Sequence, residues 1–258
     1  MKVVLLAGGF GTRLSEETTV RPKPMVEIGG RPILWHIMRQ YAAHGLNEFI
    51  VCCGYKSEFI RDYFLNYRNN LSDFTISLKS GEVDFIRTEA EDWKVTVVDT
   101  GLNTMTGGRI KAIQKYVGDE AFCLTYGDGV SNVDITEEIK FHKEQGGWAT
   151  LAAVSQPGRF GALGLDTETG HVRAFREKAA MDGNTINGGF FICEPEVFDL
   201  IDGPDTIWEQ DPMDRLVEMG KLSAFRHAGF WHPMDTLRDK NVLEELWASG
   251  EAPWKPKA

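Results

Sequence analysis

Residues 2–14 read KVVLLAGGFGTRL, an apolar run that leads directly into three glycines and an arginine. The unbroken apolar stretch at residues 2–7 predicts a strand that is buried on both faces, because a strand with one wet face would alternate. Ligands of α/β sheets bind beyond the carboxyl ends of the strands. The glycines let backbone amides approach a phosphate closely, and Arg13 adds a cation that can bond it bidentately. The stretch therefore predicts either a phosphate-binding loop or a tight strand-to-helix connection.

The spacing of this loop differs from two common phosphate motifs. Leu14 stands where a dinucleotide-binding fingerprint needs its third glycine, and the loop lacks the Gly-Lys-Ser/Thr ending of a P-loop. A dinucleotide-dependent oxidoreductase is therefore disfavoured. Lys23 lies between Pro22 and Pro24, which stiffen the backbone and present its ammonium group rigidly. A lone lysine of this kind is either a ligand for an anion or a solvated surface charge.

Strand-like and helix-like patterns alternate in the first half of the chain, and strands dominate from residue 148 onward. This order predicts an α/β domain with a mostly parallel sheet. No repeat or linker-like segment divides the chain, so we expect one domain over residues 1–258, with halves at about 1–147 and 148–258. We expect Ser57 to cap its helix and the tail at 251–258 to be peripheral. Strands are predicted at 2–7, 49–55, 74–78, 83–87, 94–99, 122–126, 149–154, 162–165, 172–176 and 186–193, and helices at 33–44, 57–67, 109–117, 136–145, 212–219 and 236–247.

The charge, the apolar stretches and the cysteines of the chain exclude several classes of protein. The 258 residues carry a formal net charge of −10 without a basic run, so the chain is a poor nucleic-acid binder, and an anionic ligand would need local positive charge or a bound cation. It has no apolar stretch long enough to span a membrane and no secretory signal pattern. The cysteines lie in apolar, strand-like segments, which predicts buried reduced thiols and a cytoplasmic protein. These cysteines are Cys52, Cys53, Cys123 and Cys193.

Two aspartates stand at the ends of predicted elements. Asp128 follows the strand at 122–126 between two glycines, and Asp235 directly precedes the helix at 236–247. Each has a structural explanation, a turn for Asp128 and a helix N-cap for Asp235. The functional alternative is a pair of carboxylates that hold Mg²⁺ beside phosphates. None of the six histidines has ligand spacing, so surface or capping roles are expected for them.

Several blocks of the sequence resemble one family. GGFGTRL (8–14) followed by RPKPMVEIGGRPIL (21–34) is similar to the signature of the sugar-1-phosphate nucleotidyltransferases. This resemblance implies a Rossmann-like sheet with an appended mixed sugar-binding sheet, Mg²⁺ as cofactor, a homo-oligomer such as a hexamer, and a link to bacterial surface polysaccharides. The similarity extends through WHIM (35–38), VDTGLNTMTGGR (98–109), TYGDGVS (125–131), INGGFF (186–191) and FWHPMDTLRDKNVLEELWASGEAPWK (230–255).

The later blocks resemble the subgroup that transfers a cytidylyl group from CTP to glucose 1-phosphate and releases pyrophosphate. The same reaction with UTP or dTTP stays an alternative, because backbone carbonyls can read the exocyclic amine of cytosine and leave no residue signature. A non-catalytic sugar-nucleotide sensor would be expected to lose a metal ligand or a phosphate cation. The candidate cations Arg13 and Lys23 and the candidate metal ligands Asp128 and Asp235 are all present here, which disfavours a sensor.

The resemblance also implies roles for individual residues. Arg13 and Lys23 are the expected catalytic cations, and Asp128 and Asp235 the Mg²⁺ ligands. Arg109, expected in a first helical turn, contacts either the cytosine or a phosphate. The nucleotide is expected at Leu6, Ala7, Gly8, Gly9, Gly11, Thr12, Arg13, Lys23, Thr104, Arg109 and Asp128.

For the sugar, the chain offers hydroxyl-binding side chains and one further cation. Glu177 and Asn187 can bond sugar hydroxyls, and Lys178 can bind the 1-phosphate, although Glu177 and Lys178 also suit a solvated charge pair. Glycines within an apolar strand, at 188–189, mark a close approach by a ligand or by backbone. Ala179 replaces the proline with which the family often continues. The expected sugar-binding residues are Tyr126, Glu177, Lys178, Asn187 and Gly188.

Overall fold

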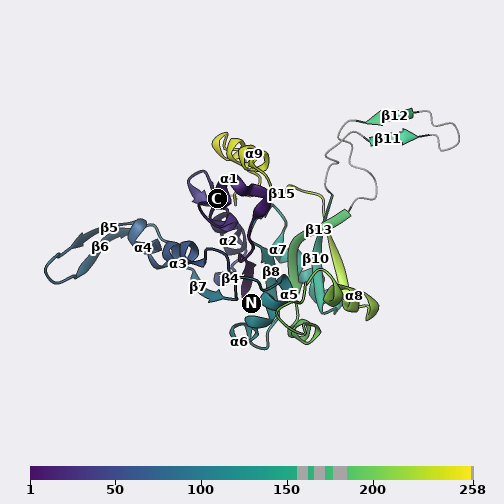
Figure 1. The fold of residues 1–258 in the computed structure, drawn as a ribbon, viewed down its shortest axis with the longest axis horizontal. Coiled ribbons are helices and arrows are strands. Elements are labelled where there is room, and N and C mark those ends of the chain that lie inside the picture. Colours follow the sequence, from purple (N-terminus) through teal and green to yellow (C-terminus); the bar gives the residue numbers. More distant parts are fainter. Residues whose placement is uncertain (156–161, 166–171, 177–184, 257–258) are drawn as a thin grey trace.

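A seven-stranded sheet forms the centre of the computed structural model, which describes residues 1–155, 162–165, 172–176 and 185–256 (Figure 1). Strands β8, β1, β4 and β7 are parallel neighbours, β10 and β14 are also parallel, and β13 joins the two groups by running antiparallel to β8 and β10. The α/β fold class with a mostly parallel sheet is confirmed. The sheet order is β14 (Leu222–His227), β10 (Ala149–Ser155), β13 (Thr185–Cys193), β8 (Phe122–Tyr126), β1 (Val3–Leu6), β4 (Glu48–Cys53) and β7 (Lys94–Asp99).

Helices cover both faces of this sheet. Val3 and Leu5 of β1 pack into one core cluster with helix α2, and Val4 and Leu6 pack into a second with α5 and α8. All four β1 side chains are buried, which explains their unbroken apolar pattern. The helices are α1 (Ser15–Thr18), α2 (Ile33–Ala43), α3 (Ser57–Leu65), α4 (Tyr67–Asn70), α5 (Thr106–Ala112), α6 (Gln114–Val117), α7 (Ile135–Gln145), α8 (Asp211–Glu218) and α9 (Leu237–Ala248), with short 3-10 turns η1 (Thr12–Leu14), η2 (Lys23–Met25) and η3 (Pro195–Leu200).

Pairs of short antiparallel strands accompany the central sheet. The β5–β6 hairpin projects away from the rest of the molecule (Figure 1), whereas β9 and β15 pair beside the carboxyl end of β8. None of the described helices is both long enough and apolar enough to cross a bilayer. The pairs are β2 (Glu27–Ile28) with β3 (Arg31–Pro32), β5 (Ser72–Ile76) with β6 (Val83–Thr88), β9 (Gly129–Ser131) with β15 (Trp231–Pro233), and β11 (Ala162–Leu165) with β12 (Val172–Arg176).

Two helix starts differ from the predictions. Ser57 is the first helical residue of α3 and not its cap; Lys56 precedes it in a left-handed conformation with φ 50° and makes no side-chain cap. Of the apolar side chains on α3, Ile60 is buried but Phe59 is 39% exposed. The helix predicted at 109–117 begins earlier, at Thr106, and is interrupted at Ile113. The earlier start of α5 was not predictable from local propensity, because Met105 donates its N–H to Pro204 O, which is distant in the sequence.

The tail and two histidines are more buried than predicted. Trp254 is 3% exposed, so the expectation of a peripheral tail is wrong for this residue. Its ring stacks near Phe230 and Trp247 and meets His36 edge-on. His36 and His142 are buried as well, which corrects the expectation of surface or capping roles. Burial is also the main reason why the pKa of His36 falls to about 4. The four cysteines are free and buried, as predicted.

A buried carboxyl on α7 predicts that stability depends on pH. Glu138 is fully buried, and neither of its carboxylate oxygens has a hydrogen-bond partner within the described part of the chain. Burial raises the pKa of Glu138 from 4.5 to about 8. Between these pH values the folded chain keeps a proton that the unfolded chain has lost. Stability should therefore fall as pH rises through this window, by roughly 5 kcal/mol in total.

Denaturant unfolding at several pH values measures this dependence. Glu138→Gln should flatten the fall in unfolding free energy between about pH 4.5 and pH 8, because it removes the group that titrates. Glu137→Gln, which alters an exposed side chain one position earlier on the same helix, should leave the slope as it is. An equal slope in wild type and Glu138→Gln would contradict the prediction.

Candidate functional site

The predicted site residues that the structure describes all line one cavity of about 980 Å³. This cavity opens beyond the carboxyl ends of the parallel neighbours β1 and β8, where ligands of α/β sheets bind. Glu177 and Lys178 lie outside the described residues. The predicted residues that line the cavity are Leu6, Ala7, Gly8, Gly9, Gly11, Thr12, Arg13, Lys23, Thr104, Arg109, Tyr126, Asp128, Asn187, Gly188 and Asp235.

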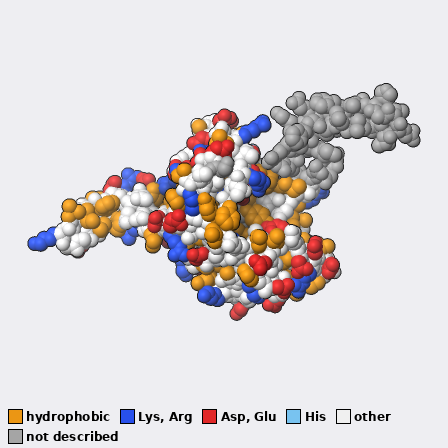
Figure 2. All heavy atoms as spheres, viewed as in Figure 1, with side chains coloured by type: hydrophobic (Ala, Val, Ile, Leu, Met, Phe, Trp, Pro, Cys, Tyr) orange, Lys and Arg blue, Asp and Glu red, His pale blue; other side chains and the backbone are white. Residues whose placement is uncertain are grey.

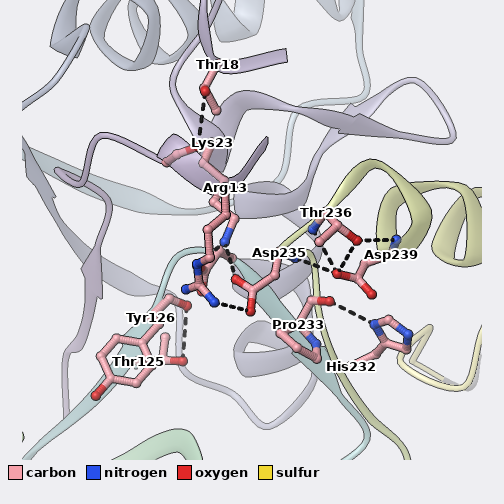
Figure 3. Close-up of polar contacts among 12 residues, drawn as sticks. Arg13, Thr18, Lys23, Thr125, Tyr126, His232, Pro233, Asp235, Thr236 and Asp239 are labelled. Carbon is pink, nitrogen blue, oxygen red and sulfur yellow. Dashed lines mark hydrogen bonds and ion pairs between the residues drawn. The ribbon is translucent and has the colours of Figure 1, made fainter. Parts of the chain in front are cut away.

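A compact charge cluster lies in the wall of this cavity. The Lys23 ammonium donates to Asp128 Oδ2 at 2.6 Å and to Asp235 Oδ1 at 2.8 Å. Arg13 Nη1 donates to the other oxygen of Asp235, Oδ2, at 2.7 Å (Figure 3). The Lys23 side chain is only 8% exposed, whereas that of Arg13 is 71% exposed. Water therefore screens the contacts of Lys23 much less than those of Arg13.

Strand pairing brings the two aspartates together from distant parts of the chain. Asp128 connects β8 to β9, and Asp235 follows β15. Gly129 of β9 pairs with Pro233 of β15, and Met234 donates its backbone N–H to the Asp128 carbonyl at 2.8 Å. The two carboxylates thus converge on one ammonium group although more than a hundred residues separate them.

Asp235 is not the N-cap of α9, which corrects one structural explanation of this residue. The Thr236 side chain accepts from the Asp239 N–H, and the Asp239 carboxylate accepts from the Thr236 N–H in return. This capping box satisfies the helix start without Asp235. Both carboxylate oxygens of Asp235 are instead directed at cations.

The donor set suits a divalent ion with oxygen ligands. Asp128 and Asp235 share a bound cation in the form of the Lys23 ammonium group, so the position between them already attracts positive charge. Carboxylates are ligands that Mg²⁺ prefers, and Mg²⁺ commonly takes one or two of them together with waters and substrate phosphates. Within the described residues, no group of three or more His, Cys, Asp or Glu side chains could hold a metal. Two carboxylates are enough for that pattern, in which waters and substrate phosphates supply the other ligands.

Arg109 is buried and donates to five acceptors from three segments. Nη1 bonds Cys53 O at 3.1 Å, Thr100 Oγ1 at 2.7 Å and Gly101 O at 2.8 Å, while Nη2 bonds Gly8 O at 3.0 Å and Leu102 O at 3.2 Å. Arg109 therefore fastens the glycine-rich loop to the ends of β4 and β7. Because α5 begins at Thr106, Arg109 lies beyond the first three helical residues, and the expected position in a first helical turn is corrected. Burial lowers the pKa of Arg109.

Packing explains several of the predicted glycines. A Cβ at Gly8 would lie 2.1 Å from Arg109 Nη1, so this glycine makes room for the guanidinium group. A Cβ at Gly188 would lie 2.7 Å from Val154 Cγ1, and one at Gly189 2.4 Å from Tyr126 Cδ2. The close approach of backbone predicted at 188–189 is confirmed at Gly188, where a Cβ would also lie 2.9 Å from Ala152 O, whereas at Gly189 the neighbour is the Tyr126 side chain.

Sequence reasoning missed part of the cavity wall. Phe10, Leu102 and Met105 line the cavity and are each about half exposed. Apolar residues inside glycine-rich, loop-like blocks of the sequence are a signal that could have identified them. Trp231 gave no such signal; its indole Nε1 donates to Gly188 O at 2.7 Å and so joins β15 to β13 beside the cavity.

Comparisons with known proteins identify a family with the α/β fold described above. A model of the nucleotidyl transferase family matches residues 2–231. Glucose-1-phosphate cytidylyltransferases from Salmonella typhi and Salmonella typhimurium are each 57% identical to this chain over 256 residues, which is 99% of this chain and 99% of theirs. The crystal structure of HddC from Yersinia pseudotuberculosis is similar in fold, with a TM-score of 0.68 at 24% identity, over 95% of this chain and 99% of that chain.

Proposed function

The chain belongs to the nucleotidyl transferase family, and we propose that it transfers the cytidylyl group of CTP to α-D-glucose 1-phosphate, giving CDP-glucose and pyrophosphate. The observation that carries this proposal is 57% identity, over essentially the whole length, to glucose-1-phosphate cytidylyltransferases. The cavity supports it, because cations and carboxylates stand together in its wall where two phosphorylated substrates would meet.

The reaction joins two polyanions, so positioning and charge neutralisation supply most of the catalysis. An oxygen of the sugar phosphate attacks the α-phosphorus of CTP in line as pyrophosphate leaves. No general base is needed, because the attacking oxygen is already ionised. Arg13 and Lys23 bind the phosphates and draw them together. Mg²⁺, held by Asp128 and Asp235, would neutralise further phosphate charge when bound.

The ion pairs of the site allow an exchange of partners. Lys23 and Arg13 balance the negative charges of Asp128 and Asp235. When a nucleotide binds, its phosphates compete for the two cations, and the carboxylates become available to the metal ion. Each cation would exchange a carboxylate for a phosphate, and each carboxylate would exchange a cation of the protein for the metal ion. No buried charge is then left without an opposite charge.

We place the sugar at the side of the cavity formed by Tyr126, Asn187 and Gly188. Asn187 Oδ1 accepts from the Gly189 N–H at 2.8 Å. Its amide group also donates towards the Tyr126 hydroxyl, and the second amide N–H is left for a sugar hydroxyl. Glu177 and Lys178 remain part of the proposed sugar site. The nucleotide lies along the glycine-rich loop and residues 104–109.

Pyrophosphate release with Mg²⁺ and glucose 1-phosphate tests the proposal, with CTP, UTP, dTTP, ATP and GTP compared in parallel. We expect release with CTP to exceed release with the other four nucleotides. A preference for UTP or dTTP would keep the mechanism and overturn the base assignment. Silence with all five would overturn the enzymatic proposal and favour a sugar-nucleotide sensor.

We further propose that the chain forms a homo-oligomer, such as a hexamer, in the cytoplasm. Apolar side chains on the projecting β5–β6 hairpin support the oligomer, because monomers seldom expose such clusters (Figure 2). Leu78 is 90% exposed and Ile86 73% exposed. The free, buried cysteines support a reducing compartment.

A further inference from the structure

Residues 203–210 lie in the connection between η3 and α8, and they pack directly against the start of α5. Met105 donates its N–H to Pro204 O at 2.8 Å, and Gly108 donates its N–H to Thr206 O at 3.2 Å. A Cβ at Gly107 would lie 2.7 Å from Thr206 O, and one at Gly108 2.4 Å from Pro204 O. The glycines of the TMTGGR block therefore make room for this connection, which supports one wall of the cavity from behind.

Glu209 at the end of this connection bridges two walls of the cavity. Thr106 Oγ1 donates to Glu209 Oε2 at 2.6 Å, and the Tyr126 hydroxyl donates to Glu209 Oε1. Thr106 opens α5 on the nucleotide side, whereas Tyr126 ends β8 on the sugar side, and both line the cavity. The Thr106 hydroxyl also accepts the Trp208 N–H at 2.9 Å, so its orientation is fixed from both sides.

The Tyr126 side chain is held in one orientation with its proton directed at Glu209. Its ring meets Phe191 edge-on with centroids 5.9 Å apart, and it packs closely over Gly189. Burial and the nearby negative charge of Glu209 raise the pKa of Tyr126 well above its usual value, so the hydroxyl stays protonated. Because that proton is engaged and the Asn187 amide donates towards the same oxygen, Tyr126 offers a ligand the remaining lone pair of its hydroxyl oxygen.

We propose that Glu209 is a positioning residue, which holds Tyr126 as a hydrogen-bond acceptor for a hydroxyl of the sugar phosphate and fixes Thr106 in the nucleotide wall. This inference rests on the proposed function. It assigns Glu209 no contact with a reacting atom. The Glu209 carboxylate links Thr106 on the nucleotide side of the cavity to Tyr126 on the sugar side. Its removal should therefore weaken the binding of the sugar more than it slows the chemical step.

Glu209→Ala tests this role through affinity and turnover together. We expect the Kd of CDP-glucose, measured by calorimetry, and the KM for glucose 1-phosphate each to rise about tenfold, a value at the low end for a charged hydrogen bond because Glu209 is exposed. The kcat should change less than about threefold, because the phosphate-binding residues are untouched. Glu209→Gln keeps one acceptor and should recover part of the affinity.

A double variant and a matched control separate positioning from general stability. If Glu209 acts through Tyr126, adding Glu209→Ala to Tyr126→Phe should raise the Kd of CDP-glucose by much less than tenfold. Asp205→Ala removes an exposed carboxylate of the same connection and should leave Kd, KM and Tm at wild-type values.

Several results would overturn the positioning role. These are an unchanged Kd and KM in Glu209→Ala, fully additive effects with Tyr126→Phe, or a loss of kcat that follows a fall in Tm. Wild-type protein that binds CDP-glucose without turnover would instead overturn the proposed catalysis, and the binding measurements would still decide the role of Glu209.

Discussion

Asp128→Asn is expected to lower kcat by roughly 10³- to 10⁴-fold, about 4 to 5.5 kcal/mol of transition-state stabilisation, while the chain stays folded. Asparagine has nearly the same shape, and it suits the turn between Gly127 and Gly129 as well as aspartate does. It removes one of the two negative charges that converge on the Lys23 ammonium group. The proposed Mg²⁺ would lose a charged ligand, and the phosphates would lose its neutralising effect.

Initial rates of pyrophosphate release at saturating CTP and glucose 1-phosphate measure this effect. Calorimetry with Mn²⁺ and CTP should show weaker metal binding in the same variant. Asp119→Asn, a change of the same kind at an exposed position outside the cavity, should behave as wild type. Near-wild-type turnover by Asp128→Asn would remove Asp128 from the metal site.

Lys23→Ala should lower kcat/KM by about 10³-fold, because a buried cation that draws the phosphates together is lost. The variant should also bind Mn²⁺ more tightly in the absence of nucleotide. In wild type, the ammonium group lies 2.6 Å from Asp128 and 2.8 Å from Asp235, where it competes with a metal ion for both carboxylates. These two effects have opposite signs, which a general loss of structure would not produce.

Steady-state rates and Mn²⁺ calorimetry check the two effects separately. Lys143→Ala removes an exposed lysine on α7 and serves as the matched control, with both quantities expected at wild-type values. An unchanged kcat/KM would show that Lys23 is not part of the phosphate site. Unchanged or weaker Mn²⁺ binding would refute the competition between ammonium and metal.

Local patterns carried the prediction of the fold. The strand at residues 2–7 was predictable because both faces of β1 are buried, so every position had to be apolar. The alternation of strands and helices along the chain identified the α/β class, because this order of elements is typical of it. The burial of Trp254 was not predictable in this way, because it depends on His36 and Phe230, which are distant in the sequence.

Some residues of the candidate site were likewise predictable from local sequence, whereas others depend on contacts between distant segments. Arg13 and Lys23 stand in short, distinctive segments, whereas the approach of Asp128 to Asp235 depends on the pairing of β9 with β15. The TMTGGR block was recognised, but not the reason for its glycines, which is the close packing of residues 203–210. Glu209 carries no local signal at all. Its role depends on hydrogen bonds from Thr106 and Tyr126, which are distant from it in the sequence.

Positional isotope analysis tests the central claim most directly. Glucose 1-phosphate labelled with ¹⁸O in its non-bridging phosphate oxygens would be converted with CTP and Mg²⁺, and the products analysed by mass spectrometry. Attack by the sugar phosphate on the α-phosphorus predicts CDP-glucose that retains every labelled oxygen and pyrophosphate that contains none. Labelled pyrophosphate, or unlabelled CMP without CDP-glucose, would contradict the account.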